Sequence, residues 1–141
     1  ASPGIVDTVI CVRGVKESGD IWGGSSVGDN DGRIWPPLFP RNSPDEKPEV
    51  VAPAHDVPVI TISGEWGLSS GTSAATVFVT GAIALMFEDK PELMDGGTDM
   101  LDNLKQWVVD SSKMRSGQDS HDDHYGYGLL QMNDLIEASQ S

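Results

Sequence analysis

The sequence predicts an α/β fold, because short strand candidates precede a helix that is apolar on every side. The strand candidates, rich in β-branched residues, are Val6–Val15, Glu49–Ala52 and Pro58–Ile62. From about Ser73 to Phe87, nearly every position is Ala, Val, Phe, Ile, Leu or Met, and a helix of this kind must be buried. Strands followed by a buried helix are typical of a sheet covered by helices.

Two further helices are expected downstream. Pro91 ends the apolar pattern, since proline disfavours helix at the residue before it. An amphipathic helix is expected from about Thr98 to Asp110, and Ser111–His124 is polar and loop-like. Asn133 is placed to cap a short final helix over Asp134–Ser139.

Composition excludes several classes of function. The chain has 141 residues, 22 acidic against 9 basic, and a formal net charge of -13. Nucleic-acid binding is disfavoured, because phosphate contacts need clustered Lys and Arg. The apolar run Ala74–Phe87 is too short to span a bilayer, so no membrane is expected, and Ala1–Gly4 does not resemble a signal peptide. Cys11 is the only cysteine and lies in an apolar run, so we expect a buried structural thiol and no internal disulfide.

The segment most informative about chemistry is Ser70-Gly71-Thr72-Ser73, which leads directly into the apolar helix. The helix dipole and free N–H groups at such a helix start favour negative charge. They would help stabilise an oxyanion formed when the Ser73 hydroxyl attacks a carbonyl. Gly71 would let a substrate backbone approach closely. Alternatively, Thr72 or Ser73 simply caps the helix, and this segment alone leaves both interpretations open.

The surrounding segments decide between them. Ser70–Ala75, with Gly81 eight residues after Ser73, resembles the nucleophile motif of the subtilisin-like serine proteases. Lys47–Pro53 resembles the family's segment upstream of that serine. Other segments that resemble the family, in the family's order, are Pro3-Gly4 with Val9–Val12, Ser25–Gly28, Asp31–Ile34 and Tyr125–Leu130.

The resemblance implies that residues 1–141 form the C-terminal portion of one catalytic domain, whose sheet is mostly parallel and covered by helices on both faces. It implies peptide-bond hydrolysis through an acyl-enzyme on Ser73, with Ser70, Gly71 and Thr72 beside the substrate and the oxyanion. In the family, the His, the Asp and the oxyanion Asn precede everything matched here, so an upstream protease segment or chain is the expected partner. Peptides or proteins are the expected substrates, and the expected location is extracellular or the cell surface.

The resemblance implies no cofactor for the chemistry, although the family often binds Ca²⁺. Asp29–Asp31 offers oxygen ligands for Ca²⁺, but the same residues are ordinary turn formers. Residues Asp119–His124 contain metal-ligand residue types, yet their spacing matches no closed metal site, and we interpret them as a solvated loop. We therefore assign no metal ligand.

Several departures from the family keep a second hypothesis open. Val77 stands where the family usually has Pro, Phe78 where it commonly has His, and Ala74 where many members have Met. These departures favour, as the alternative, a catalytically inactive binding or scaffold module. A third hypothesis is an independent acidic binding domain. Trp35–Glu46 is predicted to be a surface insertion, since it interrupts a family segment and is rich in proline.

Asp7, His55 and Ser73 also occur in the order needed for a triad within this chain. Two features oppose this assignment: Val9 replaces the glycine expected two residues after Asp7, and His55 opens no helix. We expect His55 to be a surface residue in a loop or at a strand end.

Overall fold

In the computed structural model, the described residues are 4, 6, 8–27 and 46–140. The main sheet has the order β1-β2-β6-β5, in which β1 and β2, and β2 and β6, are parallel, whereas β5 and β6 are antiparallel. Its strands are Val12–Val15 (β1), Val50–Pro53 (β2), Ser112–Lys113 (β5) and Leu129–Leu130 (β6). The α/β class with a mostly parallel sheet is thus confirmed.

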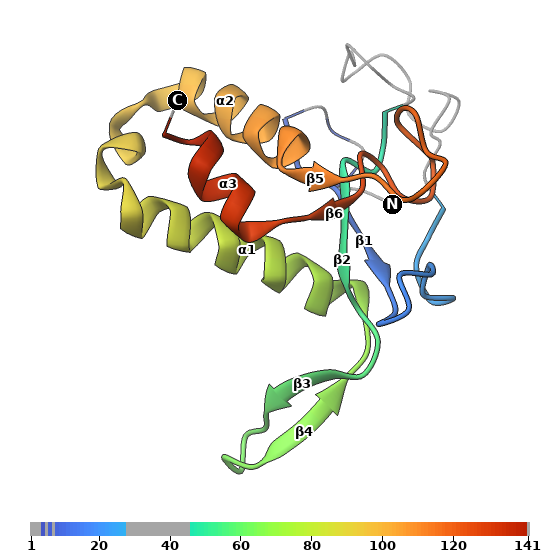
Figure 1. The fold of residues 1–141 in the computed structure, drawn as a ribbon. Helices are drawn as coiled ribbons and strands as arrows, with labels where there is room; N and C mark the ends of the chain where they lie inside the picture. Colours follow the sequence, from blue (N-terminus) through green and yellow to red (C-terminus); the bar gives the residue numbers. More distant parts are fainter. Residues whose placement is uncertain (1–3, 5, 7, 28–45, 141) are drawn as a thin grey trace.

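The remaining elements are helices and one hairpin. The helices are Thr72–Asp89 (α1), Pro91–Asp95 (η1, a 3₁₀ helix), Gly97–Asp110 (α2) and Met132–Ala138 (α3). The hairpin pairs Val57–Ile60 (β3) with Trp66–Ser69 (β4) in antiparallel register. Figure 1 shows the three α-helices lying together beside the sheet, while the hairpin projects away from them.

The core lies between α1, the sheet and the other helices. One stripe of α1, at helical spacing, is fully buried: Ala75, Val79, Ala82 and Met86. It packs with buried residues of β2, α2 and α3, namely Val50, Ala52, Leu104, Val108 and Leu135. No helix in the described part of the chain is both long and apolar enough to cross a membrane.

The opposite face of α1 is not buried by the described residues. Val77 is 69% exposed, Phe78 48% and Leu85 44%. The sequence predicted burial on every side, and the described part of the chain provides it on one stripe only. The outward apolar face therefore has no cover from the residues described.

The predicted first strand, Val6–Val15, is too long. Only Val12–Val15 forms β1, because the chain turns before it: the Val9 N–H donates to the Val6 carbonyl at 3.0 Å, and the buried Lys47 ammonium donates to the carbonyls of Val6 and Val9 at 3.0 and 2.7 Å. The next two strand predictions agree with β2 and β3 to within two residues at each end.

The ends of the helices also differ in detail from the prediction. The apolar helix was predicted to about Phe87 and ends at Asp89, before Pro91 as expected, and Pro91 itself opens η1. The final helix begins at Met132, so Asn133 lies inside it and Gln131 holds the cap position without a side-chain bond. Strands β4, β5 and β6 were not predicted, and β5 lies within Ser111–His124, which was predicted to be a loop.

Candidate functional site

The start of α1 carries the candidate nucleophile. Gly71 occupies the cap position, its N–H donates to the Ala54 carbonyl at 2.7 Å, and the helix begins at Thr72. Ser73 lies in the first turn and is exposed. The alternative in which Thr72 or Ser73 caps the helix is wrong, since no side-chain hydrogen bond caps this end.

The backbone around Gly71 leaves room for an approaching group. Gly71 has φ 161 and ψ 152, an extended conformation open to any residue. A Cβ atom built there would meet no atom closer than the Ser73 amide nitrogen, at 3.8 Å. Within the described chain, therefore, neither backbone conformation nor crowding demands glycine at this position.

Ser70 has a local structural role. Its hydroxyl oxygen accepts a hydrogen bond from the Asp56 N–H at 3.0 Å and lies 3.4 Å from Asp56 Oδ1. Asp56 has φ 51, a left-handed conformation that aspartate tolerates better than most residues. These bonds attach the loop between β2 and β3 to the turn that precedes Ser73.

An apolar groove of about 730 Å³ adjoins Ser73. Helix α1 contributes Ala74, Val77, Phe78 and Leu85 to its wall, and the hairpin contributes residues such as Val57 and Val59. Every described residue that lines it is uncharged. All three departures from the family, Ala74, Val77 and Phe78, thus lie on the groove wall together with Ser73.

The structure does not assemble the triad that was considered within the chain. Asp7 lies outside the described residues. The Nδ1 atom of His55 lies 3.3 Å from its neighbour Asp56 Oδ2, and the imidazole is 41% exposed. No hydrogen bond joins His55 to Ser73, so the structure agrees with a surface-loop histidine.

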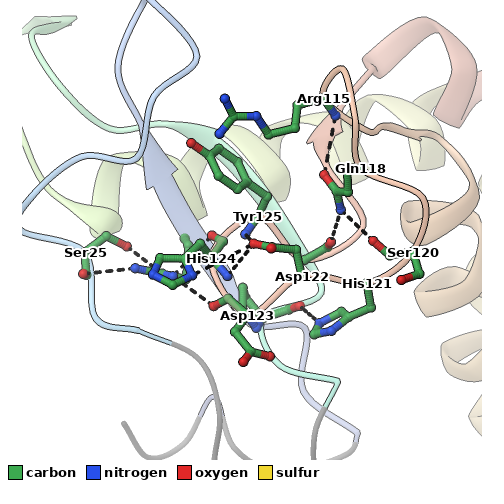
Figure 2. A network of polar contacts seen from close by, with 12 residues as sticks. Ser25, Arg115, Gln118, Ser120, His121, Asp122, Asp123, His124 and Tyr125 are labelled. Carbon is green, nitrogen blue, oxygen red and sulfur yellow. Dashed lines mark hydrogen bonds and ion pairs between the residues drawn. The ribbon is translucent and has the colours of Figure 1, made fainter.

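The polar cluster Asp119–His124 forms a hydrogen-bonded turn (Figure 2). Asp122 Oδ1 accepts the N–H groups of His124 and Tyr125 at 2.8 and 2.9 Å. Partial burial opposes ionisation of this carboxyl, but the two N–H donors outweigh it and lower the pKa of Asp122. His121 Nε2 lies 2.8 Å from the Pro48 carbonyl oxygen.

Among the described residues, no group of three or more His, Cys, Asp or Glu side chains is arranged to hold a metal ion. The residues considered for Ca²⁺, Asp29–Asp31, lie outside the described residues, as does nearly all of the predicted insertion Trp35–Glu46.

A buried arginine that contacts the Asp119–His124 turn was not predicted from the sequence. Arg13 on β1 is 4% exposed. Its Nε and Nη2 atoms donate to Ser25 Oγ and the Ser25 carbonyl, both at 3.1 Å, and Nη1 donates to the carbonyls of Asp123 and His124 at 2.9 and 3.2 Å. Burial lowers the pKa of the Arg13 guanidinium. Arg13 thereby fastens the turn to β1.

A second buried polar cluster surrounds Glu49, which is 2% exposed. Its carboxylate pairs with Lys47, contacts Lys105 of α2 at 2.9 Å and accepts the Cys11 N–H at 2.6 Å. Burial, with the Glu49 carboxylate close by, raises the pKa of the partly buried Cys11 thiol. The cluster connects α2 to the residues just before β1 and β2, and it agrees with a structural role for Cys11.

Comparison with solved structures gives consistent matches across nearly the whole chain. A structure of the patellamide maturation protease PatA matches with TM-score 0.68 and 20% identity, covering 98% of this chain and 45% of that one. The prenylagaramide maturation protease PagA matches with TM-score 0.70 and 23% identity, covering 99% and 46%. The CspB protease of Clostridium perfringens matches with TM-score 0.77 and 22% identity, covering 100% and 29%. Identities this low show the fold alone.

The chain thus spans less than half the length of these structures. A search of curated proteins finds no match to this sequence. A model of a protein family, described as the subtilase family, matches residues 1–128 of this chain. That match covers most of the chain, agrees with the solved structures, and includes the turn at Ser73. The chain therefore belongs to the subtilase family of serine proteases.

Proposed function

We propose that this chain is the nucleophile-bearing part of a serine endopeptidase, in which Ser73 attacks the scissile carbonyl and forms an acyl-enzyme. The observation that carries the proposal is the exposed Ser73 hydroxyl at an uncapped helix start. The N–H groups of that first turn and the helix dipole favour the negative charge that develops on the attacked carbonyl oxygen. The room in front of Gly71 suits the close approach of a substrate backbone.

A serine hydroxyl needs a base to accept its proton, and the base needs a group that orients it. We propose that a segment or chain outside these 141 residues supplies the His, the Asp and the oxyanion Asn. The solved relatives are more than twice as long as the part of them that matches this chain, so their domains contain further sequence that could play this part.

The apolar face of α1 that no described residue covers also supports the presence of such a segment or chain. Three large apolar side chains, Val77, Phe78 and Leu85, are 44–69% exposed along one side of the helix. Burying each would contribute roughly 1.5–3 kcal/mol, which is a large share of the 5–15 kcal/mol net stability of a typical domain. A segment packed on this face would complete the core and bring catalytic groups to the Ser73 end of the helix.

The catalytic role is tested by Ser73→Ala in the full-length protein, with Ser120→Ala as the control. We expect Ser73→Ala to lower kcat by several orders of magnitude, as loss of a triad nucleophile does. Ser120→Ala removes an exposed serine hydroxyl from the Asp119–His124 turn and should retain most of the activity. Peptidase activity that survives Ser73→Ala would overturn the assignment.

The partner is tested on the purified 141-residue chain alone. We expect self-association or the absence of a cooperative unfolding transition, and we expect the upstream segment to restore cooperative unfolding. Phe78→Ser should weaken self-association more than Thr80→Ser, a control on the same helix. Cooperative unfolding of a monomer without any partner would contradict the proposal and favour the independent acidic binding domain.

A catalytically inactive scaffold is the second candidate, and the exposure of Val77 and Phe78 on the groove wall favours it. These residues replace family residues and enlarge an apolar surface beside Ser73, as a binding module would. Under this alternative the protein binds peptides without hydrolysing them, and the sequence upstream lacks the His, Asp or Asn.

A further inference from the structure

Asp56 lies beside the turn that precedes the candidate nucleophile, although it is 17 positions before Ser73 in the chain. The loop between β2 and β3 is attached to the nucleophile turn at two points. The Gly71 N–H donates to the Ala54 carbonyl at 2.7 Å, and the Asp56 N–H donates to Ser70 Oγ at 3.0 Å. The hairpin register extends this attachment, since Val57 pairs with Ser69.

This attachment fixes how far Asp56 can be from Ser73. Ser70 is hydrogen-bonded to Asp56 and precedes Ser73 by three residues, so the Cα atoms of Ser70 and Ser73 are separated by at most about 11 Å at roughly 3.6 Å per residue, and Asp56 lies one hydrogen-bonded contact beyond Ser70. A substrate residue advances by a similar distance per position. A long side chain within about three residues of the scissile bond can therefore reach the loop.

The Asp56 carboxylate is available to such a side chain. It is 60% exposed, and its neighbours are the Ser70 hydroxyl at 3.4 Å and His55 Nδ1 at 3.3 Å. The carboxylate is thus an exposed negative charge on a loop whose backbone is attached to the nucleophile turn.

We infer that Asp56 is a specificity-determining residue that favours substrates with a Lys or Arg side chain within about three residues of the scissile bond. The inference rests on the proposed function, because Ser73 locates the scissile bond. A partly exposed ion pair contributes about 0.2–1 kcal/mol, which corresponds to a preference of roughly 1.5- to 5-fold over a neutral side chain. Salt should weaken the preference, because the pair is exposed to solvent.

The test uses full-length protein carrying Ser73→Ala, so that peptides bind without being cleaved. Dissociation constants are measured by fluorescence anisotropy for peptide pairs that differ only by Lys or Glu at successive positions along the peptide. We expect Lys peptides to bind more tightly at one or more positions, Asp56→Asn to reduce that ratio by about 2- to 5-fold, and 0.5 M NaCl to reduce it similarly.

Asp99→Asn is the matched control, since it removes the same charge from the first turn of α2, which follows the opposite end of α1 from Ser73. It should leave the Lys-to-Glu ratio unchanged. Equal binding of both peptides, no binding of either, or an equal effect of both variants overturns the inference. Labelling of wild-type protein with a serine-reactive probe separates the two claims, because charge-selective binding without Ser73 labelling would remove the proposed catalysis and keep the role of Asp56.

Discussion

Substitution of Arg13 by methionine should destabilise the fold by roughly 4–5 kcal/mol. Arg13 is 4% exposed, and methionine fills similar space without donating a hydrogen bond. Two of the Arg13 hydrogen bonds are fully buried, both to Ser25, and two reach carbonyl oxygens of the Asp119–His124 turn. Buried bonds to a charged donor are worth about 1.5 kcal/mol or more each, and partly buried ones about 0.5–1 kcal/mol, which sums to this range.

Urea denaturation of the full-length protein, followed by far-ultraviolet circular dichroism, measures the effect. Arg115→Met is the control, because Arg115 is exposed and its guanidinium carbon lies 4.4 Å from the centre of the Tyr125 ring, a contact worth about 0.5–1 kcal/mol. Proteolysis within the turn should accelerate in Arg13→Met. A loss of stability below about 1 kcal/mol would refute the reasoning, since it would mean that water satisfies these carbonyls equally well.

Three other predictions concern single features of the chain. Asp122→Ala should lower the free energy of unfolding by about 1 kcal/mol at pH 7 in urea melts, and Asp123→Ala is the control. Because the folded-state pKa of Asp122 is lowered, the stability difference between Asp122→Ala and wild type should disappear as pH falls below about 4. A stability difference that does not change with pH would contradict this prediction. Cys11 should react with iodoacetamide at pH 8 at least about tenfold more slowly than an unfolded control, because burial raises its pKa; equal rates by mass spectrometry would refute this. Deletion of Trp35–Glu46 should leave the melting temperature within a few degrees of wild type, since loop-closure cost changes slowly with length, whereas loss of cooperative melting would show that the segment is structural.

The two long helices were predicted from the sequence because they depend mainly on the hydrophobic pattern of nearby residues. The apolar run predicted α1, and the amphipathic stretch from Thr98 predicted α2 almost to its observed bounds. The first strand was predicted too long because β-branched residues mask a turn at Val6–Val9, and no local signal shows that the Lys47 ammonium binds the carbonyl oxygens of that turn. Strand β6 has only two residues and exists because β2 and β5 flank it.

The candidate site divides in the same way. Ser73 and its turn were found from a contiguous motif, and the subtilase family match includes them. Asp56 and Arg13 were missed because their roles depend on distant partners. Asp56 contacts Ser70, which is 14 positions away, and Arg13 contacts the Asp119–His124 turn, which is more than 100 positions away. An Arg within a β-branched strand is the one signal that the sequence offered for a buried charge, since charged residues are rarely buried without partners.

The most direct test of the central claim is covalent labelling of the full-length protein with a fluorophosphonate probe, followed by mass-spectrometric mapping of the adduct. The probe reacts with a serine hydroxyl that a neighbouring base has activated. We predict a single adduct, on the peptide containing Ser73, that is absent from Ser73→Ala and retained in Ser120→Ala. An adduct on a different serine, or no adduct on protein that hydrolyses peptides, would contradict the assignment of Ser73 as the nucleophile.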